Sequence, residues 1–257
     1  MDEPLFSLSS YPISITSLLL LAIGASGIGV AKSGLSGVSM VHVLVFAFVF
    51  GARASTGILL PLLIVGDLLA VRFVGHHVQW NYVKKLMPPA MIGVLIGTLF
   101  MSRVDESIFR PLIGTIVLIL TLLQILRIWK PDALEQVPHA LWFAWTMGIL
   151  AGITTMIANA AGPVIAIFLL AIALPKLELV GTSAWFFLAL NLFKVPFSIG
   201  LGLIDPSTLL LDVALTPLVL LGMLLGRWTV KRISQKWFDS LLLAFTLIAS
   251  LRLMGVF

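Results

Sequence analysis

Long apolar runs divide this chain almost from end to end, and only short polar joints separate them. Ten runs can be distinguished, at residues 14–31, 38–52, 56–74, 86–102, 108–128, 139–157, 162–175, 180–203, 212–231 and 237–256. A helix needs roughly 20 apolar residues to cross a bilayer, and lipid offers backbone groups no outside partner. The pattern therefore predicts an all-α polytopic membrane protein with no room for a soluble domain.

The composition agrees with this prediction. Charged residues make up 11% of the chain and hydrophobic residues 60%, whereas a soluble domain carries about 25% charged residues. A soluble enzyme, a nucleic-acid-binding module and a disordered protein are excluded on this ground. We expect the formal net charge of +5 to reflect Lys and Arg that anchor loops at the inner membrane face. The chain has no cysteine, which excludes disulfides and thiolate chemistry.

Two of the apolar runs, 38–52 and 162–175, are short for a full span. Each follows a stretch of small residues, at 24–37 and 151–163 respectively. Glycine lowers helix propensity and Pro163 lacks a backbone donor, so each short run and its predecessor could form a re-entrant hairpin of broken helices. Ordinary helices that pack closely through glycine are the alternative. Because the two stretches occupy matching positions, we expect broken helices.

The matching positions indicate an internal repeat. Sliding the chain over itself by 129 residues aligns Pro88 with Pro217, Gly93 with Gly222 and Gly97 with Gly226, and a shift of 125 aligns Gly27 with Gly152. We expect two repeats, 1–129 and 130–257, with about five helical segments each. Because five is odd, the second repeat would enter the membrane from the opposite side. Inverted repeats of this kind are common among secondary transporters.

The distribution of basic residues predicts the orientation. With the N-terminus outside, the outer ends would carry four cations, namely Arg53, Arg103, Arg110 and Arg252. The inner loops would carry eleven, namely Lys32, Arg72, Lys84, Lys85, Arg127, Lys130, Lys176, Arg227, Lys231, Arg232 and Lys236. Lys194 lies within a span and completes the 16. This bias predicts a multi-pass protein of a bacterial-type plasma (inner) membrane with both termini outside.

Three charged residues are not explained by loops or helix ends: Lys32 in the first small-residue stretch, Asp67 in the third run and Lys194 in the eighth. A charge at the bilayer centre costs roughly 3 kcal/mol or more when it faces lipid. Each must therefore face a partner, a cavity or a substrate. A structural ion pair would explain Asp67, snorkelling to the interface would explain Lys194, and a tight loop could bring Lys32 to the surface.

Neutral polar residues accompany these charges. Those that we select as candidate site residues are Ser33, Ser36, Thr56, Asn159, Thr182, Ser183 and Asn191. Ser and Thr at a helix start commonly cap it, but helix starts also direct free N–H groups toward anions. Lys194 follows Asn191 by three residues and shares its helix face. We therefore expect a small-oxyanion site built from Lys32, Lys194 and the polar residues, with Asp67 as the proton-coupling group.

Three stretches of sequence resemble a known family of membrane exporters. They are Gly27-Ile28-Gly29 to Gly37, Ser55-Thr56-Gly57-Ile58-Leu59-Leu60-Pro61 with Asp67, and Gly181-Thr182-Ser183-Ala184-Trp185-Phe186-Phe187 running to Asn191 and Lys194. With these stretches the chain resembles the TauE/SafE family over nearly its whole length. The resemblance implies paired repeats, secondary transport and export of sulfite or short organosulfonates. In one departure, Lys32-Ser33-Gly34-Leu35-Ser36-Gly37 replaces the glycine triplet often found after the family's first helix. Lys32 would then add charge to the site and could select an anion other than sulfite.

The function expected from these features is proton-coupled export of a small sulfur-containing anion by alternating access. An anion channel and a non-transporting membrane assembly subunit are the alternatives. An intramembrane aspartyl protease needs two carboxylates in contact, and we expect Asp205 and Asp212 to flank a loop, which leaves Asp67 alone. His42 is expected to be a packed residue rather than a ligand, and no spacing resembles a zinc site. The expected partners are the anion, protons, the lipid bilayer and a second copy in a homodimer, with no cofactor, metal or nucleic acid.

Overall fold

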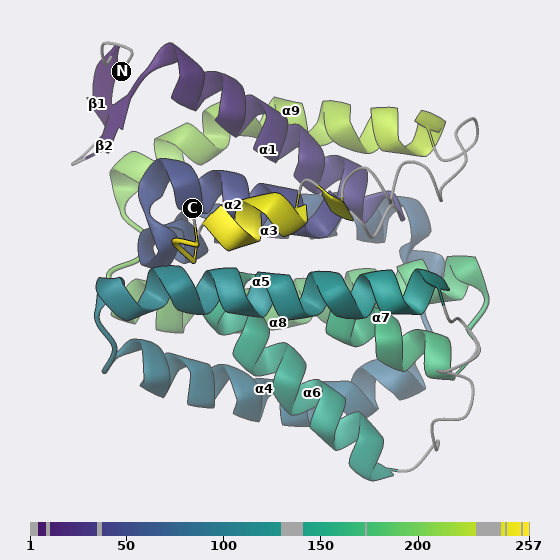
Figure 1. Cartoon of the computed structure of the whole chain (residues 1–257). Coiled ribbons are helices and arrows are strands. Elements are labelled where there is room, and N and C mark those ends of the chain that lie inside the picture. Colours follow the sequence, from purple (N-terminus) through teal and green to yellow (C-terminus); the bar gives the residue numbers. More distant parts are fainter. Residues whose placement is uncertain are drawn as a thin grey trace.

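The computed structural model of the chain describes residues 5–8, 11–34, 38–129, 141–172, 174–229, 243–244, 246–252 and 254–256. In this part of the chain, long helices lie roughly side by side in one bundle (Figure 1). The elements are β1 (Phe6–Leu8), β2 (Tyr11–Ile13), α1 (Ile15–Lys32), α2 (Ser39–Phe50), α3 (Ala52–Val74), the 3₁₀ turn η2 (Gly75–His77), α4 (Trp80–Met101), α5 (Glu106–Trp129), α6 (Leu141–Ala158), α7 (Gly162–Ala171), α8 (Lys176–Gly200) and α9 (Pro206–Thr229).

Seven helices in the described residues are long and apolar enough to cross a membrane: α1, α3 with η2, α4, α5, α6, α8 and α9. The two short runs are helical as well, but α2 has only 12 residues and α7 only 10. At a rise of 1.5 Å per residue they extend about 18 and 15 Å, roughly half of the hydrocarbon core. The prediction of a polytopic helical membrane protein is confirmed. Of the tenth run, the described residues 243–244 and 246–252 are helical.

The two small-residue stretches break the helices only at their ends. α1 continues without interruption through Gly24, Gly27 and Gly29 to Lys32, and α6 continues through Gly152 to Ala158. These glycines allow close packing instead. A Cβ at Gly29 would lie 2.0 Å from the Val219 carbonyl oxygen of α9, far inside van der Waals contact. The alternative of close glycine packing therefore holds within α1 and α6, while α2 and α7 pack beside them as short helices.

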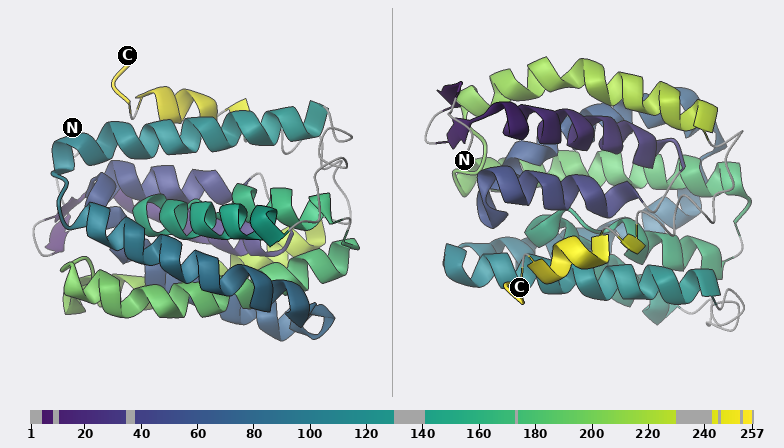
Figure 2. Two further views of the ribbon diagram at one scale, coloured as in Figure 1. Left: turned by 90° about the horizontal axis from the view of Figure 1, so that it is seen from below. Right: turned by 45° about the horizontal axis from the view of Figure 1, so that its top comes forward.

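Helices from the two halves of the chain pair with one another. α1 lies along α9 and α4 lies along α6, while α3 and α8 pack together (Figure 1). The residues that line up in the sequence comparison are at these contacts: Gly222 meets the Ser26 carbonyl of α1, and Gly93 meets Gly152. Figure 2 shows α1 beside α9 from a second direction, and the C-terminal helical residues beside α5. α1 and α6 begin at opposite ends of the bundle, and both chain ends lie toward the same end (Figure 1).

Two helix boundaries differ from the sequence prediction. α4 begins at Trp80 and includes Lys84 and Lys85, which had suggested a joint, together with both prolines that follow. α9 begins at Pro206, six residues before the apolar run. Here Asp205 caps the helix, because its Oδ1 accepts hydrogen bonds from the backbone N–H groups of Ser207 (2.8 Å) and Thr208 (3.0 Å). Proline suits the first helical position because no intrahelical bond is lost there.

The sequence prediction also missed the short antiparallel hairpin of β1 and β2, in which Phe6 pairs with Ile13. It precedes the N-cap Ser14 of α1, whose side chain accepts a hydrogen bond from Ser17 N–H. The Tyr11 ring packs edge-on against Phe50 with centroids 5.3 Å apart. The hairpin is thereby fixed to the end of α2 and α1, outside the apolar spans.

Candidate functional site

A chain of polar side chains crosses the apolar interior where α1, α3, α6 and α8 meet. Its charged members are Lys32 on α1, Asp67 on α3 and Lys194 on α8. Asp67 is fully buried and Lys194 is 1% exposed. These are the three charges that the sequence leaves unexplained, and the fold brings them into one cluster.

Asp67 has a partner on each of its two carboxylate oxygens. Its Oδ1 lies 2.5 Å from Lys32 Nζ, and its Oδ2 accepts a hydrogen bond of 2.7 Å from Asn191 Nδ2. The Lys32 ammonium also lies 4.6 Å from the centroid of the Phe187 ring, within cation–π range. The buried structural pair considered for Asp67 is therefore present. Lys32 is 16% exposed, so the pair is accessible from one side.

Lys194 has a different environment, because the atoms that accept its hydrogen bonds are all neutral. Nζ donates to Asn159 Oδ1 (2.5 Å), to the Thr155 carbonyl oxygen (2.9 Å) and to Thr155 Oγ1 (3.2 Å). A longer contact of 3.4 Å reaches Asn191 Oδ1. Lys194 thus does not snorkel to the interface. With Lys32 and Lys194 formally positive and Asp67 formally negative, the cluster carries one uncompensated positive charge.

The break between α6 and α7 supplies Asn159. This residue has the left-handed φ of 52°, a conformation that asparagine tolerates better than most residues. Its Nδ2 donates a hydrogen bond of 2.8 Å to the Thr56 carbonyl oxygen, while its Oδ1 accepts from Lys194. α7 then begins at Gly162 without a side-chain cap, which leaves first-turn N–H groups and the positive end of the helix dipole facing this region.

Two neighbouring cavities with shared lining residues lie beside the cluster. The inner one, which we call the chamber, has a volume of about 90 Å³ and is lined by Lys32, Ser39, His42, Asn159, Gly162 and Asn191 among others. Its size suits several waters or a small anion. The wider pocket of about 360 Å³ includes Lys176 and Ser183, and shares Lys32 and Phe187 with the chamber. The side chains of Lys32 and Phe187 therefore border both cavities.

The fold gathers some of the candidate residues and separates others. Lys32, Asn159 and Asn191 line the chamber, Asp67 and Lys194 bond to its walls, and Ser183 lines the wider pocket. Thr56 contributes its carbonyl oxygen, because its hydroxyl donates to Arg53 O. Ser36 lies outside the described residues.

Ser33 and Thr182 do not reach the chamber. The Ser33 hydroxyl donates to the Val30 carbonyl oxygen and lies against Gly226 of α9. The Thr182 hydroxyl accepts from Gln79 N–H at 3.0 Å, just before α4 begins. Both hydroxyls therefore serve helix packing and helix ends in this structure.

The predicted site leaves out Thr155 and His42, which both line the chamber, and the sequence analysis misplaced one carboxylate. Thr155 bonds Lys194, and its spacing of four residues from Asn159 is the signal that would have shown a shared helix face. His42 is 3% exposed and lines the chamber, and its Nδ1 has no hydrogen-bond partner among the described residues. Asp212 does not flank a loop: it lies seven residues into α9, is 4% exposed, and its carboxylate oxygens accept no hydrogen bond from the described residues.

Neither the curated proteins nor the solved structures contain a match. The sequence model of the sulfite exporter TauE/SafE family matches residues 18–253, which includes every helix that forms the charged cluster and both cavities. The chain therefore belongs to the TauE/SafE family of sulfite exporters, which are membrane transporters.

Proposed function

We propose that this protein exports sulfite or a short organosulfonate across the membrane by proton-coupled alternating access. The observation that carries the proposal is the uncompensated positive charge of the buried cluster, beside a chamber of anion-sized volume. Burying a charge without a counter-ion is costly. A transported anion would supply the missing negative charge, and so the site would be most stable when substrate is bound.

The binding step uses donors that already line the cavities. Lys32 and the amide groups of Asn159 and Asn191 would contact the sulfur-bound oxygens, and the uncapped start of α7 would add backbone N–H donors. Ser183 and Lys176 line the wider pocket, where the anion would first be attracted. A positive wall with few acidic groups raises the local concentration of anions.

Asp67 couples protons to this step in our proposal. Asp67 and the anion compete for Lys32, because the ion pair occupies the ammonium that faces the chamber. A proton on Asp67 would release Lys32 to the anion, and loss of that proton would restore the ion pair and expel the anion. Proton uptake at Asp67 would therefore accompany anion binding, and proton loss would accompany anion release, which links the two fluxes.

We propose that two inverted repeats, 1–129 and 130–257, move against each other during transport. The pairing of α1 with α9 mirrors the pairing of α6 with α4, as a two-fold relation between halves would require. The opposite entry of α1 and α6 is in keeping with inversion (Figure 1). Asp67 belongs to one half and Lys194 to the other. Rocking of the halves would therefore change the contacts that each of these residues makes across the boundary between the halves.

The orientation with both termini outside stays a proposal as well. It is supported by the placement of Arg110 and Arg252, two of the four predicted outer cations, in one pocket and of Lys32 and Lys176, two of the eleven predicted inner cations, in another. The smaller number of cations would then face outward in an inner membrane.

Sulfite flux in proteoliposomes of defined orientation tests the function. An imposed pH step should drive uphill sulfite movement in the wild type. Lys194→Ala and Asp67→Asn should abolish this uphill movement, and Arg103→Gln, an exposed residue outside the cavities, should retain it. Full uphill flux in both cluster variants contradicts the proposal. Rapid sulfite movement that only runs down the sulfite gradient, whatever the pH step, indicates a channel. Absence of flux from folded wild-type protein indicates a non-transporting subunit.

A further inference from the structure

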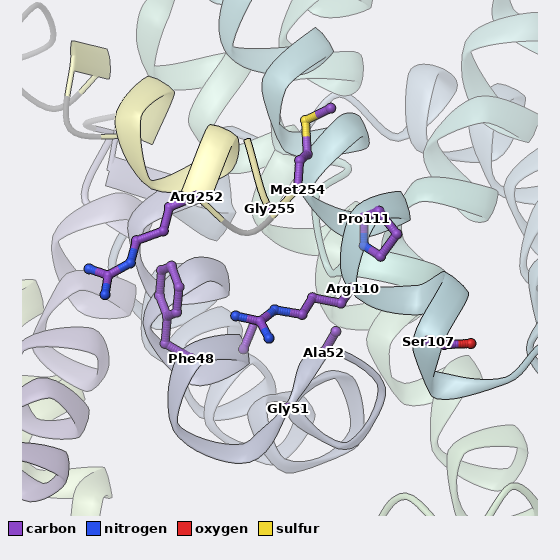
Figure 3. Close-up of a pocket in the computed structure, with 10 residues that line it drawn as sticks. Phe48, Gly51, Ala52, Ser107, Arg110, Pro111, Arg252, Met254 and Gly255 are labelled. Carbon is purple, nitrogen blue, oxygen red and sulfur yellow. The ribbon is translucent and has the colours of Figure 1, made fainter. Parts of the chain in front are cut away.

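A third cavity lies at the end of the bundle that carries the chain termini. It has a volume of about 710 Å³, and it is enclosed by the turn between α2 and α3, the first turns of α5 and the C-terminal helical residues (Figure 3). The residues that matter for its chemistry are Phe48, Gly51, Ala52, Ser107, Arg110 and Arg252. None of them belongs to the chamber or to the wider pocket.

The described residues that line this cavity include two arginines and no acidic residue. Within the described residues, neither Arg110 nor Arg252 forms an ion pair, and no acidic residue lines the walls. The two guanidinium groups come from α5 and from the C-terminal segment, and Phe48 lies between them in the close-up (Figure 3). Guanidinium groups bind oxyanions through paired N–H donors in a fixed planar geometry. A cavity lined by two guanidinium groups is suited to an oxyanion.

The backbone at the floor of the cavity adds to this character. Gly51 precedes α3 with a φ of 86° and no side-chain cap, so the helix starts at Ala52 with unsatisfied N–H groups. α3 has 23 residues, and its amino end carries a partial positive charge. Ala52 lies below Arg110 in the close-up (Figure 3). The start of α3 and the two arginines therefore both favour the binding of an anion.

The cavity is also close to the buried cluster. Thr56, whose carbonyl oxygen accepts the hydrogen bond of Asn159, follows Ala52 by four residues, or about 6 Å along the helix. Asn159 in turn bonds Lys194. One turn of α3 thus separates the cavity from the chain of polar groups that reaches the chamber.

We infer that this cavity is a second anion site, in which Arg110 and Arg252 hold a small sulfur oxyanion at the end of the path opposite Lys176. The inference rests on the proposed function, because it makes the cavity the place where the exported anion is released from the cluster. A phospholipid headgroup offers the same phosphate-like oxygens, so the test must separate a lipid from a free anion.

The absence of native cysteine makes single-cysteine labelling a direct test. Phe48→Cys places a thiol between the two arginines, and Ser102→Cys places one on the exposed end of α4, outside the cavity. Full-length protein in phosphatidylcholine vesicles is labelled with a negatively charged and a positively charged methanethiosulfonate of similar size. Sulfate and ethanesulfonate serve as free-anion probes, because sulfite itself reacts with the reagent.

We expect the anionic reagent to modify Phe48→Cys faster than the cationic one does. Adding Arg110→Gln and Arg252→Gln should reduce this preference about tenfold, as expected for two nearby charges in a partly hydrated site. Adding Arg103→Gln instead should leave it unchanged. Sulfate and ethanesulfonate should protect Phe48→Cys and not Ser102→Cys. The labelling does not depend on transport, so it can support the second anion site even if the flux assay contradicts the proposed transport.

Three results would overturn the inference. The first is a charge preference that survives loss of both arginines. The second is equal protection of both cysteines, which indicates a general surface effect. The third is a lipid occupant: phosphatidylglycerol vesicles would slow labelling of Phe48→Cys, and free anions would give no protection in either membrane.

Discussion

The ion pair between Lys32 and Asp67 can be separated from anion binding by a single substitution, Asp67→Asn. The asparagine keeps an oxygen that can accept the hydrogen bond from Asn191, but it removes the negative charge 2.5 Å from Lys32 Nζ. Breaking a buried ion pair by removing one partner costs about 3–5 kcal/mol. Because Lys32 is 16% exposed and borders the wider pocket, water can solvate its ammonium. We therefore expect the free energy of unfolding to fall by an amount near the lower end, about 3 kcal/mol.

The same substitution should strengthen anion binding. In the wild type an anion must compete with Asp67 for Lys32, and a close charge pair at an effective dielectric constant of 20 is worth about 4 kcal/mol. If the anion recovers a third to two thirds of this charge-pair energy at Lys32, its dissociation constant would fall about tenfold to a hundredfold. Calorimetric titration of the solubilised full-length protein with ethanesulfonate measures this. Ethanesulfonate is the suitable ligand because its charge does not change over the pH range of the assay, whereas sulfite changes its protonation state.

The pH dependence provides the sharper result. Wild-type binding should weaken with rising pH as the Asp67 carboxyl group loses its proton, because the ionised carboxylate retains Lys32, whereas Asp67→Asn should lack this dependence. His42 faces the same chamber, so His42→Gln serves as the comparison and should preserve the wild-type trend. Asp105→Asn, an exposed carboxylate, controls for the loss of one charge. The reasoning is refuted if Asp67→Asn binds no more tightly and keeps the pH dependence of the wild type.

Three further substitutions test the packing, the break and a helix cap. Gly222→Ala would place a Cβ 2.0 Å from the Ser26 carbonyl oxygen and should destabilise the protein by about 1–3 kcal/mol in denaturant titration, whereas Gly200→Ala, with open space around it, should have little effect. Asn159→Leu removes an acceptor from Lys194 and strains a left-handed backbone, so about 2–4 kcal/mol should be lost; Asn159→Gly, which relieves only the strain, should recover part of it. Hydrogen bonds from the Ser207 hydroxyl and the backbone N–H groups hold the pKa of Asp205 below its ordinary value. Asp205 therefore contributes stability above pH of about 4 that is lost as the pH falls through the lowered pKa. Asp205→Ala should remove about 1 kcal/mol at neutral pH and this acid sensitivity with it, as thermal unfolding at several pH values would detect.

Most of the architecture could be predicted from the sequence because lipid restricts the possible structures so strongly. An apolar run such as 56–74 must form a helix in a bilayer, and α3 contains all of these residues. Boundaries were less predictable where local signals conflict. Lys84 and Lys85 suggested a joint, but helix α4 extends past them because a helix can continue beyond the hydrocarbon layer. The β1–β2 hairpin has only three residues in each strand, too few for a periodic signal.

The site was predictable only as far as helix spacing reaches. Asn191 and Lys194 share a face at a spacing of three residues, and their contact of 3.4 Å agrees with that reasoning. The bond between Asn191 and Asp67 joins residues 124 positions apart, which no local pattern specifies. The hydroxyls of Ser33 and Thr182 looked equivalent to other site residues in sequence. Only the packing of α9 and the start of α4 decides that they turn elsewhere.

Asn191 connects the two charges that belong to different halves of the chain. Its Nδ2 donates to Asp67 and its Oδ1 faces Lys194, so both ends of one amide are engaged at once. An amide cannot exchange these roles without placing its NH₂ group against an ammonium, and its orientation is therefore fixed by the two charges. If a proton neutralises Asp67, that carboxyl group becomes a weaker acceptor, and the constraint on the amide that faces Lys194 is relaxed. Any shift of α3 against α8 would alter the same two contacts. A change at the proposed proton site would thus reach the proposed anion site through one side chain.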